Sequence, residues 1–442
     1  MKFASRFTLA LSAAVLLVGS SMPAMAQDKA KKEKAIKEAQ APKRNYSPEF
    51  RKALAPALTL FDKGKDAAGA KAAFPAVLAS IKNEDDRYEA GIFAINVGAQ
   101  LKDLAFQKEG IDLLLASATT PPAIKTQFTF QKGAIAFDAK DFAGAEKSMI
   151  EAYNMGHRGN NIEYLISTTQ SQQNRETDAM AWLMKAIDAG KAAGTLDKNY
   201  LIRAASLAAK AKNYTGAANW YRELLKIENN PDYWHDTLVY FDRSLTLDPE
   251  ETLDLMRLMR ATNGLRFQQE YAQYLDSLSY IGVRYPAEAV AVLDEGFAKG
   301  VISRSNVTFG ERYTEAKARL AEDTRTLPGA LTPAKAANAK PILTSLTGDS
   351  FFSHKDYKTS KELYEASLQK GPVLDKDGRD QSDRTRFRLA MSKAMLSDYA
   401  GAKADFAAIS GPNRKAIADY WLMYIDQLEK LAVKPATAAV IG

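Results

Sequence analysis

The chain has no cysteine and only three histidines among its 442 residues. Without cysteine the protein forms no disulfide and carries no lipid on an N-terminal cysteine, which argues against a small disulfide-stabilised extracellular domain. The histidines, His157, His235 and His354, are far apart in the sequence. Zinc sites need clustered nitrogen or sulfur ligands, so we expect no metal site and no cofactor.

Long apolar runs are scarce as well. The run from Leu9 to Val18 follows Lys2 and Arg6, and it precedes a stretch of small residues that ends at Ala26. This arrangement is typical of a secretory signal peptide over residues 1–26. No later stretch has the ~20 apolar residues that a membrane helix needs. We therefore expect export to a bacterial periplasm, without a membrane span and without a lipid anchor.

The positive charge is concentrated at the start of the chain. The net charge is +7, and residues 1–45 alone contain nine basic and three acidic residues. Nucleic-acid binding needs basic residues clustered on a folded face, so we expect no nucleic-acid partner. Residues 27–45 are interpreted as a charged, solvated linker. The alternative, contact with anionic lipid or cell-wall polymer, stays open.

A spacing of small and aromatic residues recurs along the chain. A small residue is followed by an aromatic nine positions later, by a small residue three further, and by apolar residues four and seven beyond that. Copies begin at Gly133, Ala205, Gly348 and Ala390, with a weaker one at Leu58. Antiparallel helices approach closely only where small residues meet, so Gly133 and Ala145 predict a helix crossing. The spacing therefore predicts stacked helical hairpins.

Helix-start signals extend this pattern to the rest of the chain. Ser47-Pro48, Asn230-Pro231 and Asp248-Pro249 each combine a capping residue with proline in the first turn. Glu251 completes a capping box with Asp248. Further hairpins are expected over residues 87–118, 162–189, 231–263 and 267–298.

The hairpins predict two lobes. We expect an N-terminal superhelix over 46–302, an irregular joint over 303–338, C-terminal repeats over 339–431, and a tail over 432–442. The joint is predicted from the breakers at 303–306 and 326–329, with one helix from Phe309 to Glu322 between them. The last helix, Arg414 to Leu431, is expected to cap the open end.

Residues 133–156 and 349–371 resemble the tetratricopeptide repeat (TPR) superfamily. With the segments 181–194, 252–264 and 285–300, the layout resembles exported TPR proteins of alphaproteobacteria. The resemblance implies an all-α fold, an α-solenoid of antiparallel hairpins in a right-handed superhelix. It also implies a concave groove, lined by the first helix of each hairpin, that holds a peptide or partner protein.

Projection of the first helices predicts which side chains face this groove. They are Asn96, Gln100, Gln127, Gln131, Tyr164, Thr168, Gln172 and Arg203, and further along the chain Arg384 and Arg388. The first part of this lining is neutral and polar with one aromatic, which suits an extended peptide that stacks on Tyr164. The same residues also fit solvated helix faces, and both interpretations stay open.

The sequence contains no complete catalytic motif. Ser367 and Lys370 have the serine–lysine spacing of penicillin-recognising enzymes, but the companion motifs are absent and Ser367 falls on a small position of a repeat. We therefore predict a non-enzymatic scaffold or adaptor for a protein or peptide partner in a cell-envelope complex. A chaperone or assembly factor for outer-membrane proteins is the alternative, followed by a cell-wall glycan-binding or transglycosylase-like protein. The oligomeric state is left open.

Overall fold

The computed structural model describes residues 44–63, 65–279 and 284–433. These residues form twenty α-helices and one short π-helix, with no β-strand and a single isolated bridge between Leu374 and Asp380. The predicted all-α array of hairpins is thus confirmed. The predicted signal peptide, residues 27–43 of the linker and residues 434–442 of the tail lie outside the described residues.

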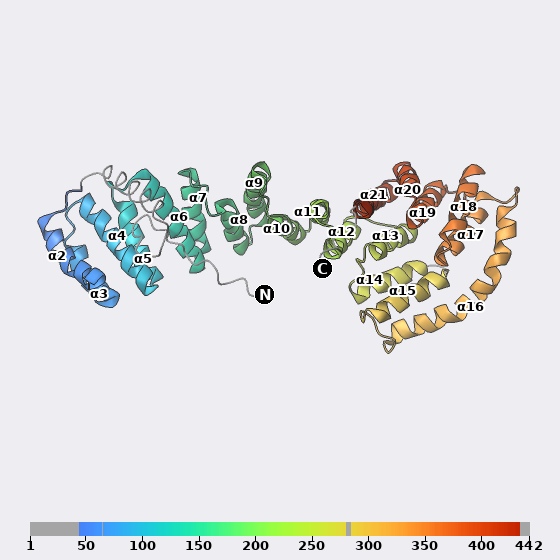
Figure 1. Cartoon of the computed structure of the whole chain (residues 1–442), viewed down its shortest axis with the longest axis horizontal. Helices are drawn as coiled ribbons and strands as arrows, with labels where there is room; N and C mark the ends of the chain where they lie inside the picture. Colours follow the sequence, from blue (N-terminus) through green and yellow to red (C-terminus); the bar gives the residue numbers. More distant parts are fainter. Residues whose placement is uncertain (1–43, 64, 280–283, 434–442) are drawn as a thin grey trace, which may run out of the picture. The chain divides into compact units, whose positions relative to one another are not determined.

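The chain divides into two compact units, residues 1–158 and 159–442. Successive helices of the first unit form antiparallel hairpins, of which α4–α5 and α6–α7 are the most extensively packed (Figure 1). Its described elements are α2 (Pro48–Leu58), the π-helix η1 (Thr59–Lys63), α3 (Ala67–Ala79), α4 (Glu84–Leu101), α5 (Leu104–Ala116), α6 (Pro122–Asp138) and α7 (Phe142–Asn154).

The second unit contains the remaining helices of the described chain. They are α8 (Ile162–Gln172), α9 (Glu176–Ala193), α10 (Lys198–Lys210), α11 (Tyr214–Ile227), α12 (Pro231–Ser244), α13 (Pro249–Ala261), α14 (Gln268–Leu278), α15 (Pro286–Ala298), α16 (Val307–Lys335), α17 (Pro341–Ser353), α18 (Tyr357–Gln369), α19 (Ser382–Met395), α20 (Tyr399–Ala407) and α21 (Pro412–Val433). The predicted boundary at 303–338 lies inside this unit.

The predicted helix starts are confirmed by their capping contacts. Ser47 accepts a hydrogen bond from the backbone N–H of Phe50, and Asn230 accepts one from that of Asp232. At α13, Asp248 accepts from the N–H of Glu251 at 2.7 Å while Glu251 accepts from the N–H of Asp248 at 3.0 Å. These side chains satisfy N–H groups that the first helical turn leaves unpaired.

Small residues lie where the helices of the first unit cross. A Cβ placed on Gly133 of α6 would lie 3.2 Å from the carbonyl oxygen of Ala145 in α7, which confirms the predicted close approach. Gly91 of α4 and Gly110 of α5 meet even more closely, because a Cβ on either glycine would lie 2.7 Å from the other's carbonyl oxygen. The hairpins therefore depend on backbone contact that larger residues would prevent.

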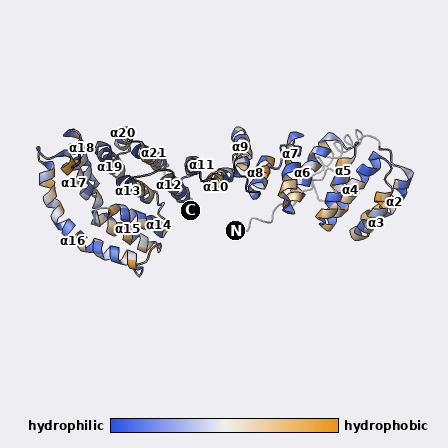
Figure 2. Cartoon of the chain, turned by 180° about the vertical axis from the view of Figure 1, so that it is seen from behind, coloured by the Kyte–Doolittle hydropathy of each residue, from blue (hydrophilic) through white to orange (hydrophobic). Residues whose placement is uncertain are grey.

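The segment predicted as an irregular joint is instead a continuous helix, α16, which contains Pro328 and Pro333. Proline inside a helix costs about 3 kcal/mol. Leu327 and Leu331, on one face of α16, pack against Phe351 of α17 and Leu363 of α18 and offset this cost. Figure 2 shows hydrophobic and hydrophilic residues alternating along α16, as an amphipathic helix requires. Tertiary packing here overrides the local breaker signals.

The sequence predicted that the C-terminal helix caps an open end. Instead, α21 packs against α12 and α13. The indole N–H of Trp234 in α12 donates to Gln427 at 3.1 Å, and the Tyr424 hydroxyl donates to the carbonyl oxygen of Ala261 at 2.8 Å. Figure 1 shows α21 beside α12 and α13 within the second unit. The segment from α12 to α21 is therefore closed on itself.

None of the helices formed by residues 44–63, 65–279 and 284–433 is long and apolar enough to cross a membrane.

The crossing of α4 and α5 predicts the effect of a single methyl group. We expect Gly110→Ala to destabilise the first unit by about 1–3 kcal/mol, since its Cβ would collide with the backbone of α4. Hydrogen exchange of the α4 and α5 amides, measured with chemical unfolding, checks this value. Gly329→Ala in α16 is the control: a Cβ there meets nothing within 4 Å, and alanine favours helix. Equal stability of Gly110→Ala and wild type would contradict the close crossing.

Candidate functional site

The predicted groove residues of the first unit form two pairs, one on each of two helices. Asn96 and Gln100 lie on α4, and Gln127 and Gln131 lie on α6. Gln100 and Gln127 are exposed, whereas Asn96 and Gln131 are half-buried. A spacing of four residues keeps each pair on one helix face. Each face presents amides, which both donate and accept hydrogen bonds.

The other predicted groove residues lie on α8 and α10 of the second unit. Tyr164 of α8 stacks on Tyr200 of α10, with ring centroids 4.9 Å apart and planes 19° apart. The Thr168 hydroxyl donates to the carbonyl oxygen of Tyr164 at 2.9 Å, so its proton is already used in a hydrogen bond within α8. Gln172, one turn further, is exposed. Because the rings stack on each other, a ligand meets the pair rather than Tyr164 alone.

Arg203 lies one turn beyond Tyr200 on α10, so its guanidinium and the tyrosine ring share a helix face. Its Nε is buried and has no hydrogen-bond partner in the described residues. Burial raises the pKa of Tyr200, so its hydroxyl stays protonated and able to donate. The α8–α10 surface, defined by Tyr164, Gln172, Tyr200 and Arg203, therefore combines stacking with hydrogen-bond donors. The eight predicted residues are divided between the two units.

Arg384 and Arg388 do not face a groove. Arg388 is fully buried, and Arg384 is 3% exposed. Arg388 Nη1 lies 2.9 Å from Asp349 of α17, and its Nε lies 3.2 Å from Asp254 of α13. Helical projection failed because it assumed an open array, whereas closure of the second unit turns this face of α19 inward.

These two arginines form the centre of a buried ionic network. Both contact Glu250 of α13, with Arg388 Nη2 at 2.5 Å and Arg384 Nε at 3.0 Å. Asp349 also pairs with Arg384 and accepts hydrogen bonds from the hydroxyls of Tyr285 and Tyr364 at 3.0 Å and 2.7 Å. The network thus joins α13, α17, α18 and α19 with the segment before α15.

The carboxylates of this network are held ionised. Burial alone would raise the pKa of Glu250, but Arg388, Arg384 and Arg284 outweigh it and hold that pKa well below its ordinary value. The same balance, burial against Arg384 and Arg388, holds the pKa of Asp349 well below its ordinary value. Charges in such a site are tolerated only when paired and hydrogen-bonded.

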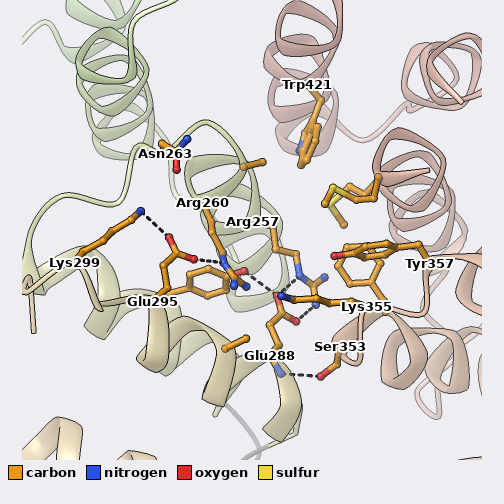
Figure 3. A pocket seen from close by; sticks show the side chains of 16 residues that line it. Arg257, Arg260, Asn263, Glu288, Glu295, Lys299, Ser353, Lys355, Tyr357 and Trp421 are labelled. Carbon is orange, nitrogen blue, oxygen red and sulfur yellow. Dashed lines mark hydrogen bonds and ion pairs between the residues drawn. The ribbon is translucent and has the colours of Figure 1, made fainter. Parts of the chain in front are cut away.

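A cavity of about 480 Å³ lies next to this network, between α13, α14, α15, α17, α18, α19 and α21 (Figure 3). Arg257 holds Glu288 by two parallel hydrogen bonds of 2.9 Å and 2.7 Å. Arg260 pairs with Glu295 at 2.8 Å, and Lys299 pairs with the same carboxylate at 2.8 Å. Burial opposes ionisation of Glu288, but Arg257 overcomes it and lowers the pKa of that carboxyl.

The central cavity was not predicted from the sequence, although the sequence contains one signal for it. Arg257 and Arg260 are three residues apart on α13, and Glu288 and Glu295 are seven apart on α15. Both spacings place the two residues of a pair on one helix face, and the opposite charges predict that the faces meet. Recognising the signal requires knowing that α13 and α15 are neighbours.

Ser367 and Lys370 serve the packing of the C-terminal hairpins. The Ser367 hydroxyl donates to the carbonyl oxygen of Pro341 at 2.7 Å. Lys370 Nζ donates to the carbonyl oxygens of Ala334 and Ala336 at 3.3 Å and 3.0 Å. The two side chains thus tie α18 to the residues around the start of α17.

Each of the three histidines contacts a different set of residues. His235 pairs with Asp236 at 2.9 Å and with Glu270 at 3.1 Å; burial alone would lower its pKa, but these carboxylates raise it to about 9. His354 lies 2.6 Å from Asp323 of α16, and His157 stacks on Phe130 at 4.4 Å. The described residues contain no group of three or more His, Cys, Asp or Glu side chains that could hold a metal ion.

Comparison with known proteins finds distant similarities among solved structures. No protein-family model matches the chain, and no curated protein matches it. Among solved structures, the chain is 11% identical to a tetratricopeptide repeat protein from Parabacteroides merdae, over 77% of this chain and 99% of that one, with a TM-score of 0.30. It is 14% identical to the TPR2AB domain of yeast Sti1 in its pHSP90 complex, over 70% and 98% of the two chains, with a TM-score of 0.22.

A third solved structure, Naa15/Naa10 bound to HypK-THB, is 15% identical, over 94% of this chain and 67% of that chain, with a TM-score of 0.32. Identities and TM-scores this low carry no argument about the family or the role of the chain. The described residues themselves form an all-α array of antiparallel helical hairpins.

The ionic network predicts a large effect of removing one partner. We expect Arg388→Leu to destabilise the second unit by about 3–5 kcal/mol, because Asp254 and Asp349, both fully buried, lose a partner. Arg325→Leu, which removes the exposed pair with Glu322, is the control and should cause no measurable change. Urea unfolding followed by tryptophan fluorescence reports on this unit, which contains all four tryptophans.

Urea unfolding at several pH values tests how the network's contribution to the free energy of unfolding depends on pH. The folded-state pKa values of Glu250 and Asp349 lie below their unfolded-state values, so their stabilisation is full above about pH 5 and is lost progressively as the pH falls from there toward the folded-state pKa values. Arg388→Leu should weaken this acid dependence. An unchanged dependence in the variant would show that the network does not set it.

Proposed function

We propose that this protein is a non-enzymatic scaffold or adaptor that holds a protein or peptide partner on its helical hairpins in the bacterial periplasm. The α8–α10 surface carries this proposal. Its stacked Tyr164 and Tyr200 offer an aromatic platform. Gln172, two turns after Tyr164 on α8, and Arg203, one turn after Tyr200 on α10, add polar side chains to the same helices. An extended peptide presents backbone carbonyls and apolar side chains at a regular spacing, which such a surface matches.

A scaffold role is supported by how the reactive side chains are used. Ser367, Lys370 and His354 each contact neighbouring helices in the second unit, where they contribute to packing. The clustered charges of the same unit pair with each other. The TPR-type fold gives a surface for partners along successive hairpins, with specificity in its variable side chains.

Periplasmic action within a cell-envelope complex is supported by the sequence of the leader. Its basic start, apolar run and small residues up to Ala26 fit export, and the absence of cysteine fits a chain that needs no disulfide after export.

Site-directed photo-crosslinking tests the α8–α10 surface. A benzophenone amino acid placed at Gln172 should give one discrete crosslinked species in intact cells, whereas the same group at the exposed Lys191 of α9 should give none. Arg203→Ala combined with Tyr164→Ala should reduce the species at least tenfold while the helical circular dichroism is unchanged. Equal crosslinking at both positions, or no effect of the double substitution, would argue against this surface.

A chaperone role is separated by a second assay. If the protein suppresses aggregation of an unfolded outer-membrane protein and the double substitution leaves that activity intact, the clientele is broad and the dedicated-adaptor proposal fails.

Export predicts the start of the mature chain. We expect the protein purified from the periplasmic fraction to begin at Gln27, because signal peptidase cleaves after small residues such as Ala24 and Ala26. Intact-mass measurement of the purified chain checks the position. A full-length chain recovered from the cytoplasm would contradict the proposed location.

A further inference from the structure

The central cavity of the second unit has an excess of positive charge. Its lining contains four cationic side chains, Arg257, Arg260, Lys299 and Lys355, and two carboxylates. Glu288 and Glu295 are both engaged by cations of the lining. Lys355, exposed at the edge of the cavity, belongs to none of the ion pairs of the described residues. The cavity therefore has an unused cation at its edge.

Two buried N–H groups of the same lining also lack an acceptor. Trp421 is 2% exposed, and its indole Nε1 has no hydrogen-bond partner in the described residues. Arg257 is 5% exposed, and its Nη1 makes no hydrogen bond there; the nearest paired carboxylate oxygen, of Asp254, lies 3.7 Å away. A buried donor without an acceptor has lost its hydrogen bonds to water and gained none in return, so an occupant with acceptor oxygens would be favoured.

The remaining walls are apolar and aromatic. Figure 3 shows the indole of Trp421 directed from α21 toward the space between Arg257 and Tyr357. Phe352, Met391 and Met395 complete these walls. Methionine and aromatic side chains adapt to flat or aliphatic groups. The volume, about 480 Å³, falls within the ~300–1,000 Å³ of small-molecule sites.

We propose that the central cavity binds a small organic acid with an apolar body. The body lies against Trp421, Phe352 and Met391, and the acidic group accepts hydrogen bonds from Lys355 and from the buried donors. A neutral ligand would leave Lys355 without a counter-charge, and a cation would be repelled by the excess positive charge. This site is independent of the α8–α10 surface and of the proposed scaffold function.

Three probes with the same body test the proposal. 4-Phenylbutyrate is anionic, 4-phenyl-1-butanol is neutral, and 4-phenylbutylamine is cationic. In calorimetric titrations of the mature protein, we expect the anion to bind saturably with one site per chain and at least tenfold more tightly than the alcohol. The amine should show no binding. Equal affinity of anion and alcohol, or no saturable binding of the anion at millimolar concentration, would overturn the proposal.

Matched variants locate the site. Lys355→Ala should weaken 4-phenylbutyrate binding about tenfold, whereas Lys358→Ala, an exposed lysine on α18 outside the lining, should leave it unchanged. Trp421→Phe keeps the ring stacking and removes the indole N–H donor. It should therefore weaken binding of 4-phenylbutyrate more than binding of 4-phenyl-1-butanol. Ala291→Phe, which projects into the cavity from α15, should abolish binding while the thermal midpoint is retained. Unchanged binding in Lys355→Ala and Ala291→Phe would place the anion elsewhere.

Discussion

The second unit depends on two arginines, one turn apart on α19, that meet the carboxylates of α13 and α17. Removing a partner from a buried ion pair costs several kcal/mol, so Arg384 and Arg388 are stable only when Glu250, Asp254 and Asp349 are all in place. Formation of the network therefore requires that α13, α17 and α19 are brought together in the closed unit. Apolar packing is compatible with many arrangements of the helices, whereas these charges are all paired in only one of those arrangements.

Closure also explains why the interior of this unit is polar. In an open array of hairpins, the faces of the terminal repeats remain exposed and must be polar for solubility. Here α21 returns to α12, where Trp234 is 1% exposed and donates to both Asn229 and Gln427. Faces that would meet solvent in an open array enclose one another instead. Their charges pair across the interior, and the central cavity remains where the pairing is incomplete.

The sequence was sufficient for features that depend on local contacts. Ser47 and Asp248 mark helix starts because a cap needs only a few residues, and Gly133 with Ala145 marks a crossing within one hairpin. The sequence was insufficient where contacts between distant segments determine the structure. α16 continues through Pro328 because of its packing on α17 and α18. Burial of Arg388 depends on Glu250 and Asp254, which lie more than 100 residues earlier in the chain. Neither the candidate cavity nor the network could be predicted before the neighbours of α13 were known.

Burial of Arg384 and Arg388 changes what a partner can meet. Taken as groove residues, they would have favoured an acidic ligand; as network residues they are neutralised and inaccessible. The α8–α10 surface then keeps a neutral polar character around its tyrosine stack, with Arg203 as its cation. An extended, weakly charged peptide fits this surface better than an acidic one. Unpaired positive charge is found at the central cavity instead, where Lys355 and the buried donors favour an acidic group, and where a volume of about 480 Å³ suits a small molecule.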